Sequence, residues 1–173
     1  GRSEAAGVMA TVAPSMDIQV SSNFERLLFD LYHRDAGAVA AAMAEQKQTG
    51  SFTLPQGALA ELRRGFASGR SAREETLAMI ARVHRETGLL LDPHTAIGVV
   101  AAEANRGEQR IPMITLGTAH PAKFPDAVEE AAGVRPPLPP GLADLYEREE
   151  RLARVPNDLA AVQTAVRARR RPS

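Results

Sequence analysis

Apolar side chains recur three or four positions apart along most of this chain, which is the spacing of amphipathic helices. Ser22 and Ser71 each stand three residues before a glutamate and predict a capping box at a helix start. Asp35 is a typical N-cap, and Gly50 and Gly88 are typical residues after a helix end. The pattern therefore predicts four helices, at residues 24–32, 35–46, 55–66 and 71–88.

Two more helices are predicted farther along the chain. Asp92 is a typical N-cap and Pro93 a typical first helical residue, so a helix should begin here and run to Gly107. The apolar residues within 124–131 again have helical spacing, and Gly133 marks the end of that helix.

The apolar run at residues 111–116 lies between these two helices and is too short for a buried helix. It predicts an interior strand, followed by a tight polar turn and the helix at 124–131. A strand, a turn and a helix in this order form half of a βαβ unit. Small molecules bind in open α/β sheets at the carboxyl ends of the strands, so Thr118 and His120 are candidates for a binding site.

The other extended segments are short. Residues 8–14 and 51–54 favour short strands, but strands this far apart in sequence do not easily form a stable sheet by themselves. Either they pair with strands outside this sequence, or they are not strands.

Both ends of the chain differ in composition from its middle. The polar residues 1–7 are expected to lie outside the fold, as a disordered end or an expression scar. The prolines within 134–141 predict a stiff linker. Residues 142–173 should then form the C-terminal helices, at 142–151 and 158–170.

Composition narrows the function classes. The 173 residues include 21 basic and 21 acidic side chains, so no net field draws the chain to nucleic acid or to an anionic membrane. No cysteine is present, which excludes disulfides and thiolate chemistry and suits a reducing compartment. No apolar run is long enough to span a bilayer. We therefore expect a cytoplasmic protein with neither a nucleic-acid nor a membrane partner. The arginine-rich residues 167–171 complement a helix dipole and are a weak signal for nucleic acid.

Four stretches of the sequence resemble one enzyme family. The string TAHPAKF at residues 118–124 closely resembles the C-terminal signature of threonine synthases, which use pyridoxal phosphate. Three other stretches agree with that family in the same order: PSMDIQVSSNFERLLFDL at 14–31, DPHTAIGV at 92–99 and PNDLAAVQ at 156–163. The resemblance covers essentially the whole chain, but the chain covers only the C-terminal part of the family's sequence.

The resemblance implies a fold and an activity. Residues 1–173 would be the C-terminal portion of a catalytic α/β domain of the tryptophan-synthase-β-like type, also called fold type II. This portion is rich in helices, and its few strands complete a sheet that begins upstream. Threonine synthases convert O-phosphohomoserine and water to threonine and phosphate, by γ-elimination of phosphate and addition of water at Cβ. The cofactor lysine and the phosphate loop lie upstream in the family, so the N-terminal part of the same enzyme is the expected partner. The isolated chain is expected to be inactive.

Thr118 is the candidate cofactor contact. In threonine synthases the matching threonine hydroxyl bonds the pyridine nitrogen of pyridoxal phosphate, where other cofactor folds use an aspartate. From the residue alone, Thr118 is more simply a turn residue whose hydroxyl caps the next helix.

Three further residues are candidate substrate contacts. Asn23 and Arg26 lie at the start of a predicted helix, where free N–H groups and an arginine suit a phosphate or a carboxylate. Ordinary helix capping is the alternative for that helix start. His94 is the third candidate, and a structural hydrogen bond is the alternative both for it and for His120.

No catalytic residue and no metal ligand is expected in this chain. Its two lysines are Lys47 and Lys123, and the resemblance places the cofactor lysine in neither segment. His94 and His120 lack a second ligand three or four residues away. The alternative to an enzyme portion is a non-enzymatic helical interaction module, in which runs of alanine, leucine and arginine bind a partner protein.

Overall fold

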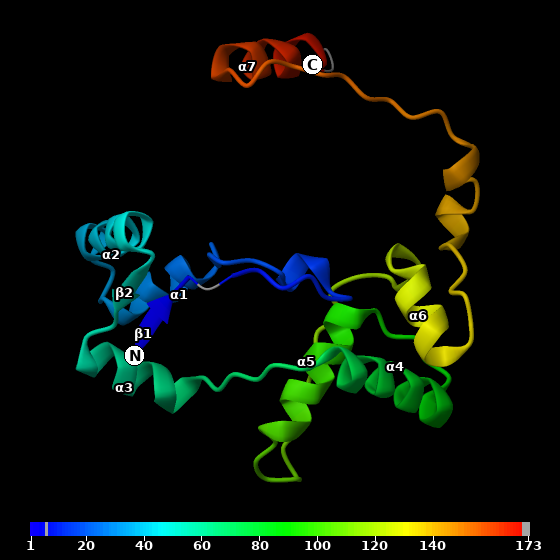
Figure 1. The fold of residues 1–173 in the computed structure, drawn as a ribbon, viewed down its shortest axis with the longest axis horizontal. Helices are drawn as coiled ribbons and strands as arrows, with labels where there is room; N and C mark the ends of the chain where they lie inside the picture. The colour runs from blue at the N-terminus through cyan, green and yellow to red at the C-terminus, as the bar shows by residue number, and fades with distance from the viewer. Residues whose placement is uncertain (6, 171–173) are drawn as a thin grey trace. The chain divides into compact units, whose positions relative to one another are not determined.

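The chain forms two compact units, Gly1–Pro137 and Leu138–Ser173. The structure, a computed structural model, describes residues 1–5 and 7–170 (Figure 1). The helices of the first unit are α1 (Phe24–Leu31), α2 (Ala36–Thr49), α3 (Gln56–Gly65), α4 (Arg73–Thr87), α5 (Pro93–Ala104) and α6 (Pro125–Ala132). The second unit contains one α-helix in its described part, α7 (Leu159–Ala168).

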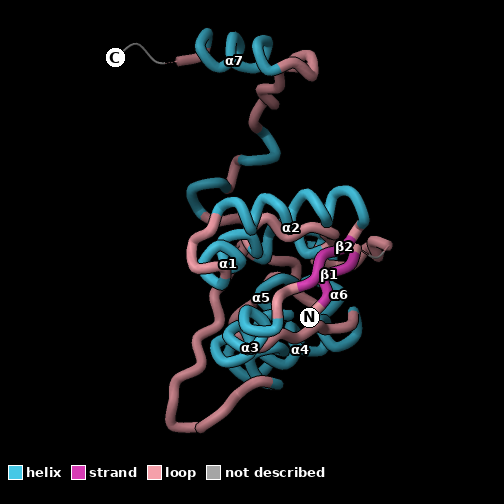
Figure 2. The backbone as a smooth tube through the Cα atoms, turned by 90° about the vertical axis from the view of Figure 1, so that its left-hand side faces the viewer, coloured by secondary structure: helices cyan, strands magenta, loops and turns pink. Residues whose placement is uncertain are grey.

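A two-stranded antiparallel sheet joins the beginning of the chain to its middle. Strand β1 (Arg2–Glu4) pairs with β2 (Ser51–Thr53), with Ser3 opposite Phe52 (Figure 2). The extended segment predicted at residues 51–54 is therefore confirmed. The prediction that residues 1–7 lie outside the fold is wrong for β1, because β2 presents free backbone groups to which these residues bind. Residue 6, in the same predicted segment, lies outside the described residues.

The first hydrophobic core lies between α1, α2, β2 and the segment that leads into α3. Its buried members are Leu28, Ala42, Phe52 and Leu54. Local chemistry sets the boundaries of α2. The Asp35 carboxylate accepts a hydrogen bond from the N–H of Ala38 at 3.0 Å, and Gly50 ends the helix with φ of 77°. Both predictions for α2 are confirmed, since a capping carboxylate and a left-handed glycine act within one helical turn.

The second hydrophobic core lies between α4, α5 and α6. Its buried members are Met79, Ile80, Ala96, Val100 and Val128. Gly88 and Gly133 end α4 and α6 in the left-handed conformation, and the Asp92 side chain caps α5, as the sequence predicts. α5 therefore packs in the core and carries a polar cap at its first turn.

The two predicted capping boxes are absent from the structure. α1 begins after Asn23, which already has helical dihedral angles and makes no side-chain cap. α4 begins after Ala72, and the hydroxyl of Ser71 bonds the carbonyl of Ala72 and the hydroxyl of Thr76 instead. In both cases the helix begins one residue later than a box requires, which puts the serine out of reach of the N3 amide.

Two of the predicted strands do not form in the described chain. Residues 8–14 contain no strand, and Met9 is 79% exposed. Residues 111–116 are extended but pair with no described strand, and Ile114 and Leu116 are 80% and 76% exposed. A strand needs a neighbouring strand for its backbone groups, and β2 is already paired with β1.

The second unit contains less helix than predicted. Residues 142–151 form only short 3-10 turns, at Pro140–Leu142 and Leu145–Glu147. A helix this short is marginal without tertiary packing, and Leu145 and Tyr146 are exposed. The last predicted helix is confirmed as α7, whose N-cap Asp158 accepts a hydrogen bond from the N–H of Ala161 at 2.8 Å.

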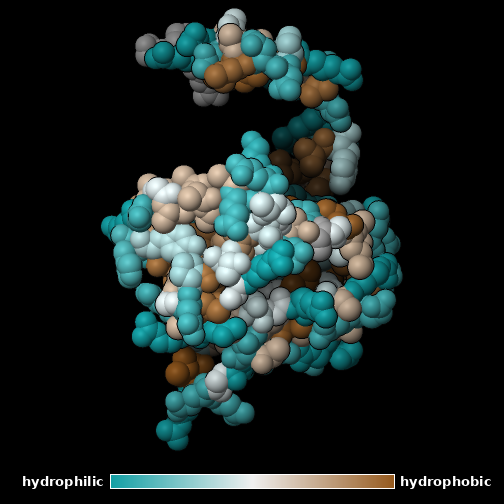
Figure 3. Space-filling view, turned by 60° about the vertical axis from the view of Figure 1, so that its left-hand side comes forward, coloured by the Kyte–Doolittle hydropathy of each residue, from teal (hydrophilic) through white to brown (hydrophobic). Residues whose placement is uncertain are grey.

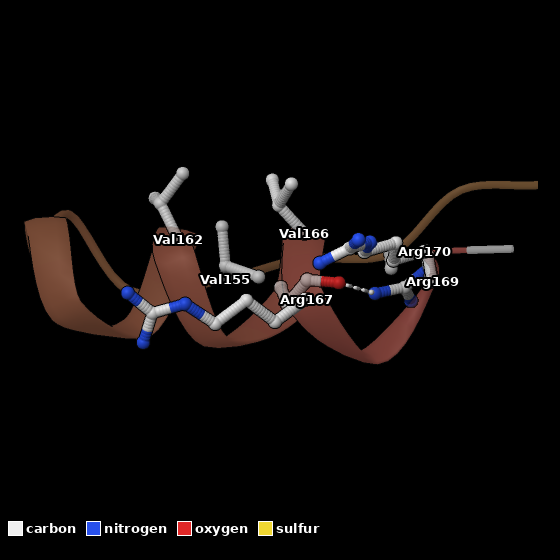
Figure 4. A pocket seen from close by; sticks show the side chains of 8 residues that line it. Val155, Val162, Val166, Arg167, Arg169 and Arg170 are labelled. Carbon is white, nitrogen blue, oxygen red and sulfur yellow. Dashed lines mark hydrogen bonds between the residues drawn. The ribbon is translucent and has the colours of Figure 1, made fainter. Parts of the chain in front are cut away.

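The apolar face of α7 lines a groove of about 620 Å³ within the second unit. Val162 and Val166 project from the helix beside Val155 (Figure 4), and Arg167 and Arg170 also belong to the lining. Brown apolar surface is visible on this helix in Figure 3. Arg171, the last residue of the arginine-rich tail, lies outside the described residues. Within residues 1–5 and 7–170, no helix combines the length and the apolar character that crossing a membrane would need.

Candidate functional site

Thr118 follows the extended segment 111–116 and precedes the 3-10 turn Pro121–Lys123. Its backbone N–H donates a hydrogen bond to the hydroxyl oxygen of Thr95, on the first turn of α5, at 3.0 Å. Its side chain is exposed, and its hydroxyl makes no hydrogen bond to any described residue. Thr118 is thus held through its backbone, while its hydroxyl is available to a ligand.

The helix-capping role considered for Thr118 is wrong. His120 caps the turn Pro121–Lys123, since its Nδ1 accepts a hydrogen bond from the N–H of Ala122 at 3.2 Å. The following helix, α6, begins after Phe124 with no side-chain cap. The hydroxyl of Thr118 is therefore not needed for any helix start nearby.

The carboxylate of Asp92, 1% exposed, organises the first turn of α5. One oxygen accepts hydrogen bonds from the backbone N–H of His94 and from its ring Nδ1, each at 2.9 Å. The other accepts from the N–H of Thr95 at 3.3 Å and from the Thr95 hydroxyl. A buried carboxylate with this many donors is well satisfied, so the turn is rigid.

His94 uses both ring nitrogens within the protein. Nε2 accepts a hydrogen bond from the backbone N–H of Ser15 at 3.2 Å, so Nδ1 carries the proton that goes to Asp92. The ring is 5% exposed and packs against Phe124, with ring centroids 4.6 Å apart. The expected structural hydrogen bonds of His94 and His120 are both present.

A shallow hollow of about 400 Å³ lies beside Thr118. Its lining is mainly apolar and comes from α5, from the extended segment before Thr118 and from two loops. The residues that line it are Met16, Ala67, Gly69, His94, Gly98, Ala101, Ala102, Asn105, Met113, Ile114, Thr115, Leu116 and Thr118. None of these side chains is an acid, a lysine or an arginine, so its polar contacts come from neutral groups.

Known proteins match the part of this chain that contains Thr95 and Thr118. A family model described as threonine synthase, C-terminal, matches residues 95–166, which include both Thr95 and Thr118. The threonine synthase of Pseudomonas aeruginosa is 53% identical over 157 residues, or 90% of this chain and 34% of that protein. The threonine synthase of Corynebacterium glutamicum is 43% identical over 156 residues, 88% of this chain and 32% of that protein. This chain matches the C-terminal portion of threonine synthases.

Solved threonine synthases have the same fold over nearly the whole chain. A crystal structure of the pyridoxal-phosphate-bound threonine synthase of Brucella melitensis superposes with a TM-score of 0.84 and 49% identity. It covers 97% of this chain, which in turn covers 36% of that protein. The yeast enzyme superposes with a TM-score of 0.79 and 33% identity over 96% of this chain, which spans 38% of it. The predicted fold class is confirmed, and the chain spans about a third of the threonine synthases it matches.

The three candidate substrate contacts, Asn23, Arg26 and His94, do not all lie at the hollow beside Thr118. Asn23 and Arg26 are exposed at the start of α1. Arg26 lines a separate hollow with Ser22 and Glu25, and neither Asn23 nor Arg26 lines the hollow beside Thr118. Of the three candidates, His94 alone lines that hollow, and a substrate contact by its ring would require it to give up a hydrogen bond.

Both lysines lie outside the lining of that hollow. Lys47 is exposed in the last turn of α2. Lys123 is exposed as well, with its ammonium 5.9 Å from the centre of the Phe124 ring.

Thr95 is the residue that sequence reasoning missed. The motif at residues 92–99 predicts the helix start at Asp92 and Pro93 and a role for His94, but it assigns no role to Thr95. A threonine three residues after an N-cap aspartate can bond that aspartate, and this local signal would have singled it out. Its second bond, to the N–H of Thr118, depends on the tertiary fold.

Proposed function

We propose that this chain is the C-terminal portion of a threonine synthase that converts O-phosphohomoserine and water to threonine and phosphate with pyridoxal phosphate. The threonine synthase of Pseudomonas aeruginosa, 53% identical, supports the reaction. The pyridoxal-phosphate-bound enzyme of Brucella melitensis supports the cofactor. The observation that carries the proposal is Thr118, whose backbone is fixed and whose hydroxyl is available beside an apolar hollow. The same matches favour this function over an interaction module.

The residues beside Thr118 suit one part of this cofactor. A pyridine nitrogen needs a single hydrogen-bond partner in an otherwise apolar surrounding, and Thr118 offers a neutral hydroxyl next to apolar lining. The lining contains no lysine or arginine, and both ring nitrogens of His94 are already bonded within the protein, so it does not suit the phosphate of the cofactor. That group would be held by the N-terminal part of the enzyme, which is the proposed partner of this chain.

When bound, the cofactor supplies an electron sink for the substrate carbanions. The contribution of this chain is to set the hydrogen bond to the ring. A threonine hydroxyl donates to the pyridine nitrogen without transferring its proton, because its acidity is too low. A carboxylic acid at this position would instead favour a protonated ring. Thr118 thereby tunes how strongly the ring withdraws electrons.

The remaining roles stay predictions. Asn23 and Arg26 suit the phosphate or the carboxylate of O-phosphohomoserine, because an exposed arginine beside a helix N-terminus attracts anions. A contact of the substrate with His94 and a cytoplasmic location are likewise predictions. The cofactor lysine is proposed to come from the N-terminal part, so the isolated chain should be inactive.

The test replaces Thr118 in the full-length enzyme that contains this chain. Thr118→Val keeps the shape but removes the donor, which costs on the order of 1 to 3 kcal/mol for an unpaired buried acceptor. We expect the affinity for pyridoxal phosphate to fall by roughly ten- to a hundredfold, measured by titration of the apoenzyme.

Thr115→Val is the matched control, because Thr115 lines the same hollow and should not contact the ring nitrogen. It should leave the cofactor affinity unchanged. Equal affinity in wild type and Thr118→Val would remove Thr118 from the cofactor site.

A further inference from the structure

We propose that Thr95 is a positioning residue for the cofactor contact, because its hydroxyl holds the backbone of Thr118 and so aims the Thr118 hydroxyl at the pyridine nitrogen. This inference rests on the proposed function of Thr118. It adds a buried relay that runs from the carboxylate of Asp92 through the hydroxyl of Thr95 to the amide of Thr118.

The direction of each hydrogen bond in this relay follows from its donors. A hydroxyl has one proton, and the proton of Thr95 goes to Asp92, since an ionised carboxylate can only accept. The lone pairs of the Thr95 oxygen then accept the N–H of Thr118 at 3.0 Å. A hydroxyl that donates to a carboxylate becomes a better acceptor, so Asp92 strengthens the bond to Thr118.

The relay is the main tie between Thr118 and the helical core. In the part of the chain that the structure describes, the bond from Thr118 to Thr95 is the one hydrogen bond that residues 112–119 make to another segment. The side chains of Ile114 and Leu116 are largely exposed and add little packing. Thr95 itself is 6% exposed and lies on a helix anchored in the core. The position of Thr118 is therefore set from Thr95.

Gly98 supplies a second point of contact one helical turn along α5. A Cβ atom at Gly98 would lie 3.1 Å from the Cγ2 of Thr115, closer than ordinary packing allows. The glycine thus permits residues 115–118 to lie close against the helix. Thr95 and Gly98 stand three positions apart, so they share one face of α5 and together define the path of the segment.

The test measures the pyridine nitrogen itself. The full-length holoenzyme is loaded with pyridoxal phosphate labelled with ¹⁵N in the ring, and the ¹⁵N chemical shift reports the hydrogen bond at that atom. Thr95→Val keeps the shape and removes the hydroxyl, so the shift should move in the same direction as in Thr118→Val. Thr95→Ser keeps the hydroxyl and should restore the wild-type shift. We expect Thr95→Val to lower cofactor affinity about tenfold.

Two further variants separate positioning from loss of stability. Thr76→Val removes another buried threonine hydroxyl, which bonds the carbonyl of Ala72. Both residues are distant from Thr118 in the sequence. Thr76→Val should lower the melting temperature and leave the ¹⁵N shift unchanged. Gly98→Ala leaves the relay intact but pushes Thr115 outward, and should move the shift by less than Thr95→Val does. This variant keeps the test decisive if Thr95→Val does not fold.

The outcomes distinguish this inference from the function on which it rests. If Thr118→Val moves the ¹⁵N shift while Thr95→Val and Gly98→Ala leave it unchanged, Thr95 is not a positioning residue and the role of Thr118 stands. If Thr118→Val itself leaves the shift unchanged, the cofactor role of Thr118 fails, and the positioning role fails with it. A change in Thr76→Val as large as that in Thr95→Val would also overturn the inference, since any buried hydroxyl would then have the same effect.

Discussion

The first turn of α5 and the segment 111–116 differ in how many of their groups find a partner within the described chain. Around Asp92, each buried polar group has a partner from the chain itself. In 111–116 the side chains are apolar, yet Ile114 and Leu116 are exposed and the backbone pairs with no described strand. Natural proteins rarely expose such a run without covering it. The comparison teaches that the described chain supplies every partner around Asp92 but leaves the apolar side chains of 111–116 exposed. We propose that another part of the full-length enzyme covers this segment.

The largest expected effect concerns the proposed covering of segment 111–116 in the full-length enzyme. In the full-length enzyme, Leu116→Ala should lower the free energy of unfolding by about 2 to 5 kcal/mol, because a covered leucine leaves a cavity when truncated. In the separated chain the same change should lie within about 0.5 kcal/mol, as for any exposed site. Denaturant unfolding of both forms measures the difference.

Leu28→Ala serves as the control for this pair of measurements. Leu28 is fully buried within the chain, so its truncation should destabilise both forms alike. A Leu116→Ala effect of the same size in both forms would show that the segment needs no cover from elsewhere.

A smaller effect is expected at the first turn of α5, where the buried polar groups have their partners within the described chain. Asp92→Ala removes the cap of α5 and leaves the Thr95 hydroxyl and the His94 ring without their acceptor. We expect a loss on the order of 2 kcal/mol in the separated chain and in the full-length enzyme.

The N-cap of α7, Asp158, provides the comparison for that variant, because its carboxylate is exposed and bonds a single amide. Asp158→Ala should cost only about 1 kcal/mol of local helix stability. Equal losses in the two variants, seen by circular dichroism during thermal melts, would reduce the buried network around Asp92 to a simple cap.

The smallest expected effect is an absence of reaction. Neither Lys47 nor Lys123 lines the hollow beside Thr118, so the separated chain should not attach pyridoxal phosphate covalently. Borohydride reduction with excess cofactor, followed by peptide mapping, measures the attachment. Stoichiometric labelling of either lysine would mean that the chain is more complete than the exposed segment suggests.

Features that act within one helical turn could be predicted from the sequence. The caps at Asp35 and Asp92 and the terminating glycines Gly50 and Gly133 depend on residues a few positions away. The capping boxes at Ser22 and Ser71 were not predicted correctly. A box requires the helix to begin at one particular residue, and both helices begin one residue later.

Features that depend on distant residues could not be predicted. The pairing of β1 with β2 joins segments some fifty positions apart, and three polar residues carry no pattern that announces it. The apolar pattern of 111–116 predicts burial, but the pattern does not reveal that these side chains are exposed in the described structure. In the candidate site, the motif at residues 118–124 predicts Thr118. The role of Thr95 depends on its bond to the N–H of Thr118, 23 positions away, which the sequence does not reveal.

The strand β1 also has a consequence for the order in which the first unit folds. Ser3 pairs with Phe52, so this pairing cannot form until β2 has been synthesised and brought back to β1. α1 and α2 make their contacts over much shorter separations, and local contacts form faster than distant ones. We therefore expect β1 to dock after the first core has formed, onto a surface that already contains α2 and Phe52.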